Sequence, residues 1–195
     1  MSHYSQHGQT GGGGVRRRDG GSPSNQSRGY GGGGRHDQPD DKVSKHWPNY
    51  LEGGYFDEAG NLKVEYVSRC LPDDEHLPDD KQHGVEPLIR AMANGRPRLT
   101  TGQLRRFFGH CRTLETRLKS GASTWLELRT KFLSLDVAAS DAYGKSQRKI
   151  PGLFYDFIQR NVHAVKNEND FLKGFLPHFE ALVGFGSLHV QKDRN

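Results

Sequence analysis

Residues 99–118, LTTGQLRRFFGHCRTLETRL, indicate the fold class, because their apolar residues repeat with the period of an α-helix. The spacing places six of them on one helical face: Leu104, Phe107, Phe108, Cys111, Leu114 and Leu118. Thr100 and Gln103 form a T-x-x-Q capping box, a pattern typical of the first residues of a helix. The stretch therefore predicts an amphipathic helix with one face buried in a core.

The rest of the chain after residue 95 shows the same helical period and no convincing strand alternation. Thr124 and Glu127 form a second capping box, and further helical segments begin near Trp125, after Pro151 and near Asn167. Pro177 lies inside the last segment, where we expect it to kink the helix or to cost a hydrogen bond. A short helix over 85–96 precedes them. The pattern predicts an all-α fold, a compact bundle of about four to five helices.

Composition divides the chain into four parts. Residues 1–41 contain GGGG twice and few apolar groups, which predicts a disordered Gly/Arg-rich tail that serves as a spacer or as an RNA-binding arm. Residues 42–98 hold an aromatic-rich segment, an acidic linker and a short helix, which we expect to pack on the bundle. Residues 99–186 are the predicted bundle core, and 187–195 are a C-terminal tail.

The net charge of +5 is distributed unevenly. Residues 96–149 hold twelve basic and four acidic residues, a net charge of +8, whereas 42–95 hold six basic and ten acidic residues, a net charge of −4. A local excess of this kind is typical of a surface that binds a polyanion. A merely solvated basic face is the alternative.

The sequence also predicts a compartment. The chain has no run of 18 apolar residues, which predicts no transmembrane helix and no membrane partner, and its first residues lack the apolar core of a secretory signal. Cys70 and Cys111 lack C-x-x-C spacing, which favours a reducing, intracellular environment. We therefore expect a cytoplasmic protein.

The cations of the quoted helix fall on both edges of its apolar face. Arg105, Arg112 and Lys119, spaced by seven, form one row, and Arg106 lies on the other edge. Small residues between them, such as Gly109, would let a phosphate backbone approach closely. Cations continue through the next segment, and the predicted RNA-backbone-binding residues are Arg105, Arg106, Arg112, Lys119, Arg129, Lys131, Lys145 and Arg148. The alternative is that these side chains cover neighbouring helices or pair with acids such as Glu115.

No motif in the sequence indicates catalysis or a metal. His110 and His178 lie on amphipathic segments, where a core or boundary histidine is the default, and Cys111 belongs to the apolar face. The acidic residues of 73–80 lack the glycine and terminal glutamate of a calcium loop. We expect no enzyme activity, no cofactor and no metal.

Four stretches carry a resemblance to a known family: WPNYLEGGYFDEAGNLKVEYV, LTTGQLRRFF, FLSLDVAASDAYGK and FLPHFEALVGFG. In this order, over residues 46–186, they resemble the small helical subunit of type III-A (Csm) CRISPR effector complexes. The resemblance implies a non-catalytic, all-helical subunit of antiviral defence that stacks with copies of itself in a short filament. It also implies contacts with crRNA and target RNA, with the large subunit and with the backbone subunits.

Site residues follow from the same resemblance. Arg105 and Arg106, just after the LTT start, would contact the nucleic-acid backbone, with Arg112, Lys131 and Lys145 as companions. Two other functions remain open on the sequence. One is a stand-alone RNA-binding protein that uses the Gly/Arg tail, and the other is a helical adaptor that binds only protein.

Overall fold

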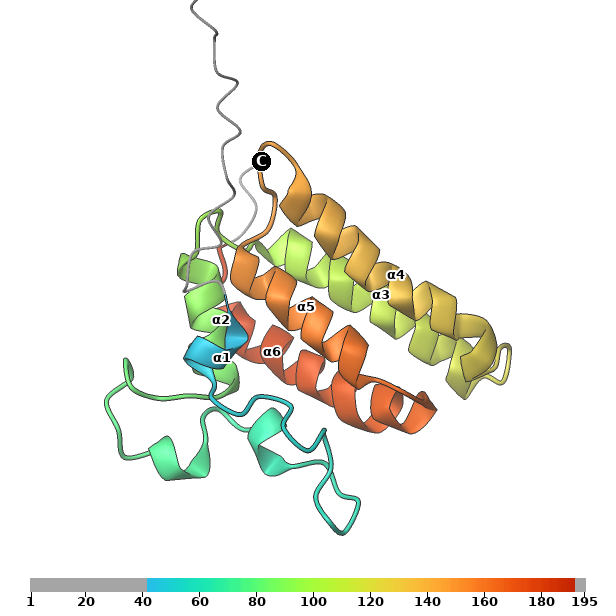
Figure 1. Ribbon diagram of the computed structural model, residues 1–195, viewed down its shortest axis with the longest axis horizontal. Helices are drawn as coiled ribbons and strands as arrows, with labels where there is room; N and C mark the ends of the chain where they lie inside the picture. Colours follow the sequence, from blue (N-terminus) through green and yellow to red (C-terminus); the bar gives the residue numbers. More distant parts are fainter. Residues whose placement is uncertain (1–41, 192–195) are drawn as a thin grey trace, which may run out of the picture. The chain divides into compact units, whose positions relative to one another are not determined.

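The computed structural model describes residues 42–191. The predicted tail 1–41 and the last four residues of the predicted C-terminal tail lie outside this range. Within it the chain forms α1 (Val43–His46), α2 (Val85–Asn94), α3 (Thr101–Lys119), α4 (Trp125–Gly144), α5 (Gly152–Ala164) and α6 (Leu176–His189) (Figure 1). The described residues contain two isolated β-bridges and no strand, so the predicted all-α class is confirmed.

Three short helical turns complete the described part of the chain. Two are 3₁₀ turns, η2 (Val64–Tyr66) and η3 (Pro72–Asp74), and both belong to the long connection between α1 and α2. The third, η4 (Asp170–Phe175), is a π-helix that continues directly into α6.

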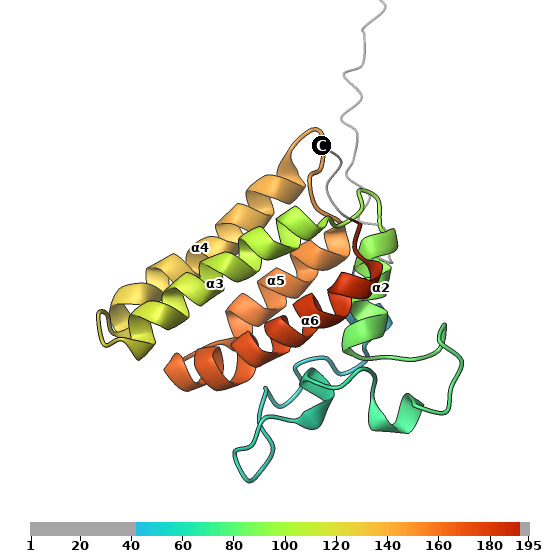
Figure 2. The same ribbon diagram turned by 180° about the vertical axis from the view of Figure 1, so that it is seen from behind.

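The bundle consists of α3 to α6, with α2 packed across one end of α6 (Figures 1 and 2). α3 and α4 form an antiparallel hairpin; α4 also packs on α5, and α3 also packs on α6. Aromatic side chains fill the interior: Phe107 of α3 meets Phe154 of α5 at 5.2 Å between ring centroids, and Phe157 meets Phe179 of α6 at 5.6 Å. Phe132 of α4 belongs to the same buried cluster, so all four helices share the core.

Pro177 does not break the last helix. The π turn η4 immediately precedes it and runs without a break into α6, so the helix continues through Pro177. Gly174 of the π turn is packed closely, because a Cβ there would lie 2.7 Å from the Tyr55 ring. The sequence predicted a disturbance at this position, and the structure shows it as a change of helix type.

The segment 47–66 packs its large side chains into the bundle and satisfies their polar ends there. Tyr50 Oη lies 2.8 Å from His178 Nε2, and His178 Nδ1 donates to the Tyr66 carbonyl at 2.7 Å. Asn161 of α5 donates to Tyr50 Oη at 2.7 Å and accepts from Tyr55 Oη at 2.8 Å. Burial lowers the pKa of His178 to about 4, so the ring is neutral and accepts the Tyr50 proton. We call these five residues the tyrosine–histidine network.

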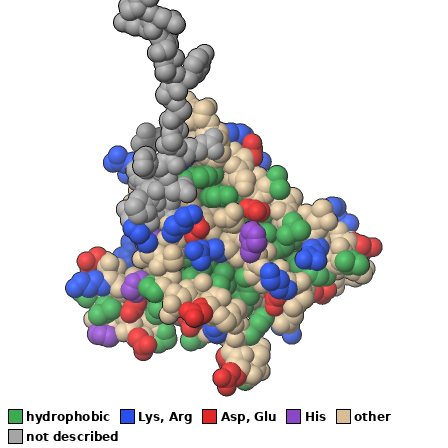
Figure 3. Space-filling view, viewed as in Figure 1, with side chains coloured by type: hydrophobic (Ala, Val, Ile, Leu, Met, Phe, Trp, Pro, Cys, Tyr) green, Lys and Arg blue, Asp and Glu red, His purple; other side chains and the backbone are tan. Residues whose placement is uncertain are grey.

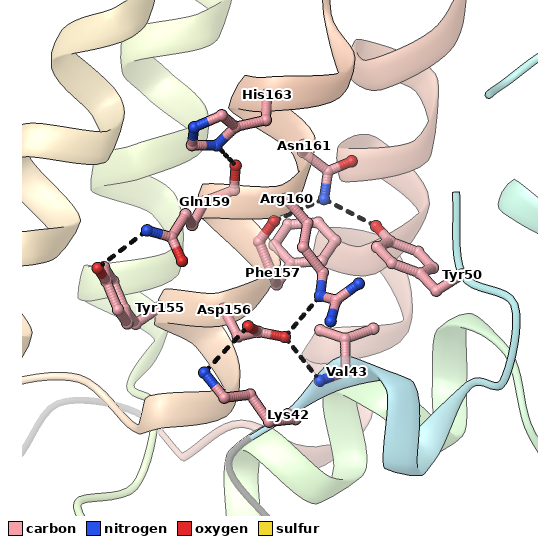
Figure 4. Close-up of polar contacts among 10 residues, drawn as sticks. All are labelled: Lys42, Val43, Tyr50, Tyr155, Asp156, Phe157, Gln159, Arg160, Asn161 and His163. Carbon is pink, nitrogen blue, oxygen red and sulfur yellow. Dashed lines mark hydrogen bonds and ion pairs between the residues drawn. The ribbon is translucent and has the colours of Figure 1, made fainter. Parts of the chain in front are cut away.

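A buried carboxylate fixes α1 to α5 (Figure 4). Asp156 Oδ2 accepts from the Val43 backbone N–H and from Arg160 Nε, both at 2.8 Å. Lys42 Nζ lies 3.5 Å from the other carboxylate oxygen. Because Asp156 is 5% exposed and fully partnered, this cluster attaches the start of the described chain to the bundle.

Candidate nucleic-acid interface

Helix α3 has the start and the buried face that its sequence predicts. Thr100 Oγ1 accepts from the Gln103 backbone N–H, and Gln103 Oε1 accepts from the Thr100 backbone N–H at 2.9 Å, which completes the capping box. Leu104, Cys111 and Leu114 are buried. The opposite side of α3 is exposed, and it carries the arginines.

Gly109 lies between the two arginines that begin the exposed side. It is four residues after Arg105 and three after Arg106, so it is the next-turn neighbour of both. Both arginines are exposed, and neither forms an ion pair with any residue from 42 to 191. Two unneutralised guanidinium groups thus flank a position without a side chain, a geometry that admits an anionic chain.

The row predicted from the spacing of seven is partly neutralised within the chain. Arg112 Nη1 and Lys119 Nζ each lie 2.7 Å from a carboxylate oxygen of Glu115, whose side chain is 8% exposed. The Arg112 guanidinium also lies over the Phe108 ring, 5.9 Å from its centroid. Arg105 is thus the member of this row without an ion pair in the described residues, whereas Arg112 and Lys119 also hold a buried acid in place.

A groove of about 720 Å³ runs between α3 and α4. Arg106 lines it from α3, Lys145 lines it from just beyond the end of α4, and Lys149 lines it from the following loop. Lys145 pairs with Asp141 at 2.8 Å. Arg106 and Lys149 form no ion pair within the described range.

The remaining predicted residues lie elsewhere on α4 and beyond it. Arg129 and Lys131 are exposed, but they are two positions apart on the helix and therefore point to different sides. Arg148 lies over the ring of Tyr143 at 4.4 Å, and that ring stacks on Tyr155 of α5 at 4.8 Å. The structure does not bring all eight predicted residues to one surface.

Gln103 and His110 also line the groove, although the predicted set does not include them. The side chain of Gln103 donates to the Lys149 carbonyl, and the Lys149 backbone N–H donates to the Ala142 carbonyl at 2.8 Å. His110 Nε2 donates to the Lys131 carbonyl at 2.9 Å, which links α3 to α4. The sequence predicted Gln103 as a capping residue and His110 as a core or boundary histidine. Their contacts across the groove could not be predicted, because they depend on which turns of the antiparallel helices face each other.

The outer side of α4 exposes apolar side chains. Leu126 is 81% exposed, Leu133 43% and Val137 69%, and their spacing places them on one side of the helix. Figure 3 shows hydrophobic side chains among interspersed Lys, Arg, Asp and Glu on the side of the molecule that it views. An aligned set of exposed leucine and valine residues is typical of a surface that another protein covers.

Cys111 is fully buried, and burial raises the pKa of its thiol to about 12, so it acts as a small apolar residue.

Within residues 42–191 the structure places no three His, Cys, Asp or Glu side chains together in a way that would hold a metal ion. No helix in the described range is long and apolar enough to span a membrane.

Fold and surface define a small all-α protein whose longest helical hairpin carries a strong excess of positive charge. The Csm2 Type III-A family model matches residues 89–192, more than half of the chain, and the chain belongs to that family. It is thus a small subunit of a type III-A CRISPR complex, and membership implies assembly with the other Csm subunits of such a complex. The resemblance seen in the sequence is confirmed.

The matched range begins at Ile89, inside α2, and includes all of α3 to α6. The segment 46–88, which the resemblance in the sequence also included, lies outside it. No curated protein and no solved structure matches the chain.

Proposed function

We propose that this subunit binds the backbone of the RNA strands in its complex, crRNA or target RNA, without reading their sequence. One observation carries the proposal: Arg105 and Arg106 are exposed, have no ion pair in the described residues and flank Gly109. Contacts from arginine to phosphate oxygens position a protein on a nucleic acid and carry no sequence information. The role is structural and non-catalytic, in a cytoplasmic complex of antiviral defence.

The charge of the hairpin supports this proposal over a purely protein-binding role. Residues 96–149 carry a net charge of +8, which is more than the net charge of the whole chain. Glu115 pairs with two cations and Asp141 with one, so these acids leave Arg105, Arg106, Lys131 and Lys149 without a carboxylate partner in the described residues. A surplus of this kind attracts a polyanion and makes the affinity depend on salt.

The test removes the two free arginines and keeps the pair around Glu115. We expect Arg105→Ala/Arg106→Ala to bind unrelated single-stranded RNAs more weakly, with a log affinity–log salt slope shallower by about 1.4, since each phosphate contact contributes about 0.7. Lys81→Ala/Lys173→Ala removes the same charge from exposed positions elsewhere and is the matched control. Equal slopes for the wild type and both variants would refute RNA-backbone binding by α3.

A second observation favours a protein neighbour on the outer side of α4. We propose that Leu126, Leu133 and Val137 contact an adjoining subunit of the complex, a second copy of this chain in the filament that the family resemblance implies. Leu126→Glu/Val137→Glu should reduce association of the subunit with the assembled complex and leave RNA binding by the isolated chain unchanged. Normal incorporation of this variant would contradict the assignment of the surface.

A further inference from the structure

The groove between α3 and α4 differs from the rest of the basic surface, because it has depth and an apolar floor. Phe107, Leu135 and Ile150 line it and are buried, and they make this floor. Its volume of about 720 Å³ lies in the range of sites that hold a small organic molecule. A phosphate chain alone needs only a charged surface, so the apolar floor calls for a different chemical group.

The polar groups of the groove are unevenly placed. The antiparallel pairing of α3 and α4 brings Arg106, near the start of α3, to the same end as Lys145 and Lys149, which follow α4. Further along α3, His110 and Thr113 line the groove. Asp141 also lines this end and pairs with Lys145, so three cations face one carboxylate and the end keeps a positive excess that suits an anion. The middle offers hydrogen-bonding groups above an apolar floor.

The neutral His110 ring has one tautomer at the groove. Its Nε2 lies 2.9 Å from the Lys131 carbonyl, which can only accept, so Nε2 carries the proton in the neutral ring. The other nitrogen, Nδ1, is then an acceptor. The hydroxyl groups of Thr113 and Ser134 donate to the Gly109 and Lys131 carbonyls, so their oxygens are acceptors in the groove. Together with the His110 acceptor they form a set that can accept hydrogen bonds from the amino group of a base.

Gly109 opens the groove and is not explained by packing within the chain. Glycine is among the poorest helix formers, yet Gly109 lies in the middle of α3. A Cβ at Gly109 would meet no atom within 4 Å. By contrast, a Cβ at Gly186 of α6 would lie 3.0 Å from Leu104, so internal packing accounts for that glycine. Close approach of a group from outside the chain would account for Gly109.

We infer that this groove takes the base of one unpaired nucleotide of the bound RNA, with the adjoining phosphate on Arg106, Lys145 and Lys149. A nucleotide joins a flat ring with apolar faces and polar edges to an anion, which matches the floor, the wall and the charged end of the groove. An acidic peptide would use the cations and leave the floor and His110 unused. The inference rests on the proposed RNA binding, and it adds a contact to a base.

The test measures a base contact separately from backbone contacts. The full chain is titrated with a 12-nucleotide adenine-only RNA and with an abasic RNA of the same length and charge. We expect the wild type to bind the base-containing strand about tenfold more tightly, as stacking and burial of a base supply affinity that an abasic strand lacks. Equal affinities for the two strands would overturn the inference.

Two variants fill the groove without changing its charge. Gly109→Phe and Ala138→Phe project from opposite walls, and both should bring the tenfold preference close to one while binding to the abasic strand persists. Gly184→Phe on α6 is the matched control, since a Cβ there also meets nothing within 4 Å and Gly184 lies outside the groove. Circular dichroism verifies that all three fold. A preference that survives both groove variants would overturn the inference.

Failure of this inference is distinguishable from failure of the proposed function. If Arg105→Ala/Arg106→Ala flattens the salt slope while the wild type treats both strands alike, backbone binding stands and the base site is wrong. If the wild type binds neither strand, both are wrong.

Discussion

The hairpin α3–α4 and the segment 47–66 use polar groups in opposite ways. The segment directs its tyrosine hydroxyls inward, where Tyr50 and Tyr55 meet His178 and Asn161. The hairpin directs Arg105 and Arg106 outward, without partners in the described residues. Polar groups that are satisfied inside hold a fold together, whereas unpartnered cations outside contribute little to stability and are available for a ligand. The family match includes the hairpin and excludes the segment.

This contrast predicts that Asn161→Ala destabilises the protein more than loss of either hairpin arginine. The substitution removes the acceptor of Tyr55 Oη and a donor to Tyr50 Oη in a fully buried site, at a cost of about 4 kcal/mol in the free energy of unfolding. Urea denaturation measures this change in the free energy of unfolding. Arg106→Ala, the comparison variant, should change the same quantity by less than about 0.5 kcal/mol. A similar loss of stability in Asn161→Ala and Arg106→Ala would contradict the distinction between the two regions.

The tyrosine–histidine network should make stability depend on pH. The folded-state pKa of His178 is about 4, below the usual 6.5, because burial disfavours the charged ring. The unfolded chain therefore binds a proton at His178 before the folded chain does. This contribution to stability is complete above pH 6.5, declines as the pH falls, and is lost by pH 4, a change of about 3 kcal/mol.

Urea denaturation of wild type and His178→Gln across this range isolates that contribution. Tyr50 and Tyr66, which contact the ring, have pKa values raised by burial and stay neutral there. The variant should show a flatter dependence of stability on pH. Parallel curves for the two proteins would contradict the buried, neutral histidine.

Two glycines give the smallest expected effects, with opposite signs. Gly109→Ala should stabilise the protein by up to about 1 kcal/mol, because alanine favours the helix and its Cβ meets no neighbour. Gly174→Ala should destabilise by about 1 to 3 kcal/mol, since the new Cβ would lie 2.7 Å from Tyr55. Thermal denaturation of both variants compares the open hairpin with the packed segment. A change in stability of the same sign for both variants would contradict either the open surroundings of Gly109 or the close packing of Gly174.

The sequence predicted what depends on local periodicity. The apolar positions of α3 and its capping box follow from spacings of three and four residues, and the structure has both. Hydrogen bonds such as that between Tyr50 and His178 join residues 128 positions apart, and no local pattern indicates them. The burial of these polar side chains could therefore be seen only in the three-dimensional structure.

For the candidate site, too, the sequence predicted local features and not long-range contacts. Each cation was visible in the sequence, but its surroundings were not. Glu115 is a nearby acid in the sequence, yet its burial between Arg112 and Lys119 depends on the packing of α3 in the bundle. The groove depends on the antiparallel pairing of α3 with α4, which places Lys149 beside Arg106.

Photo-crosslinking of the full chain to RNA that contains 4-thiouridine, followed by mass spectrometry of the crosslinked peptides, would locate the RNA-binding surface on the chain. If the RNA lies on the hairpin α3–α4, we expect crosslinks in the first half of α3 and in residues 142–149, and none in 47–66. Crosslinks confined to residues 1–41 or to 47–66 would contradict it, because the RNA would then be bound outside the hairpin.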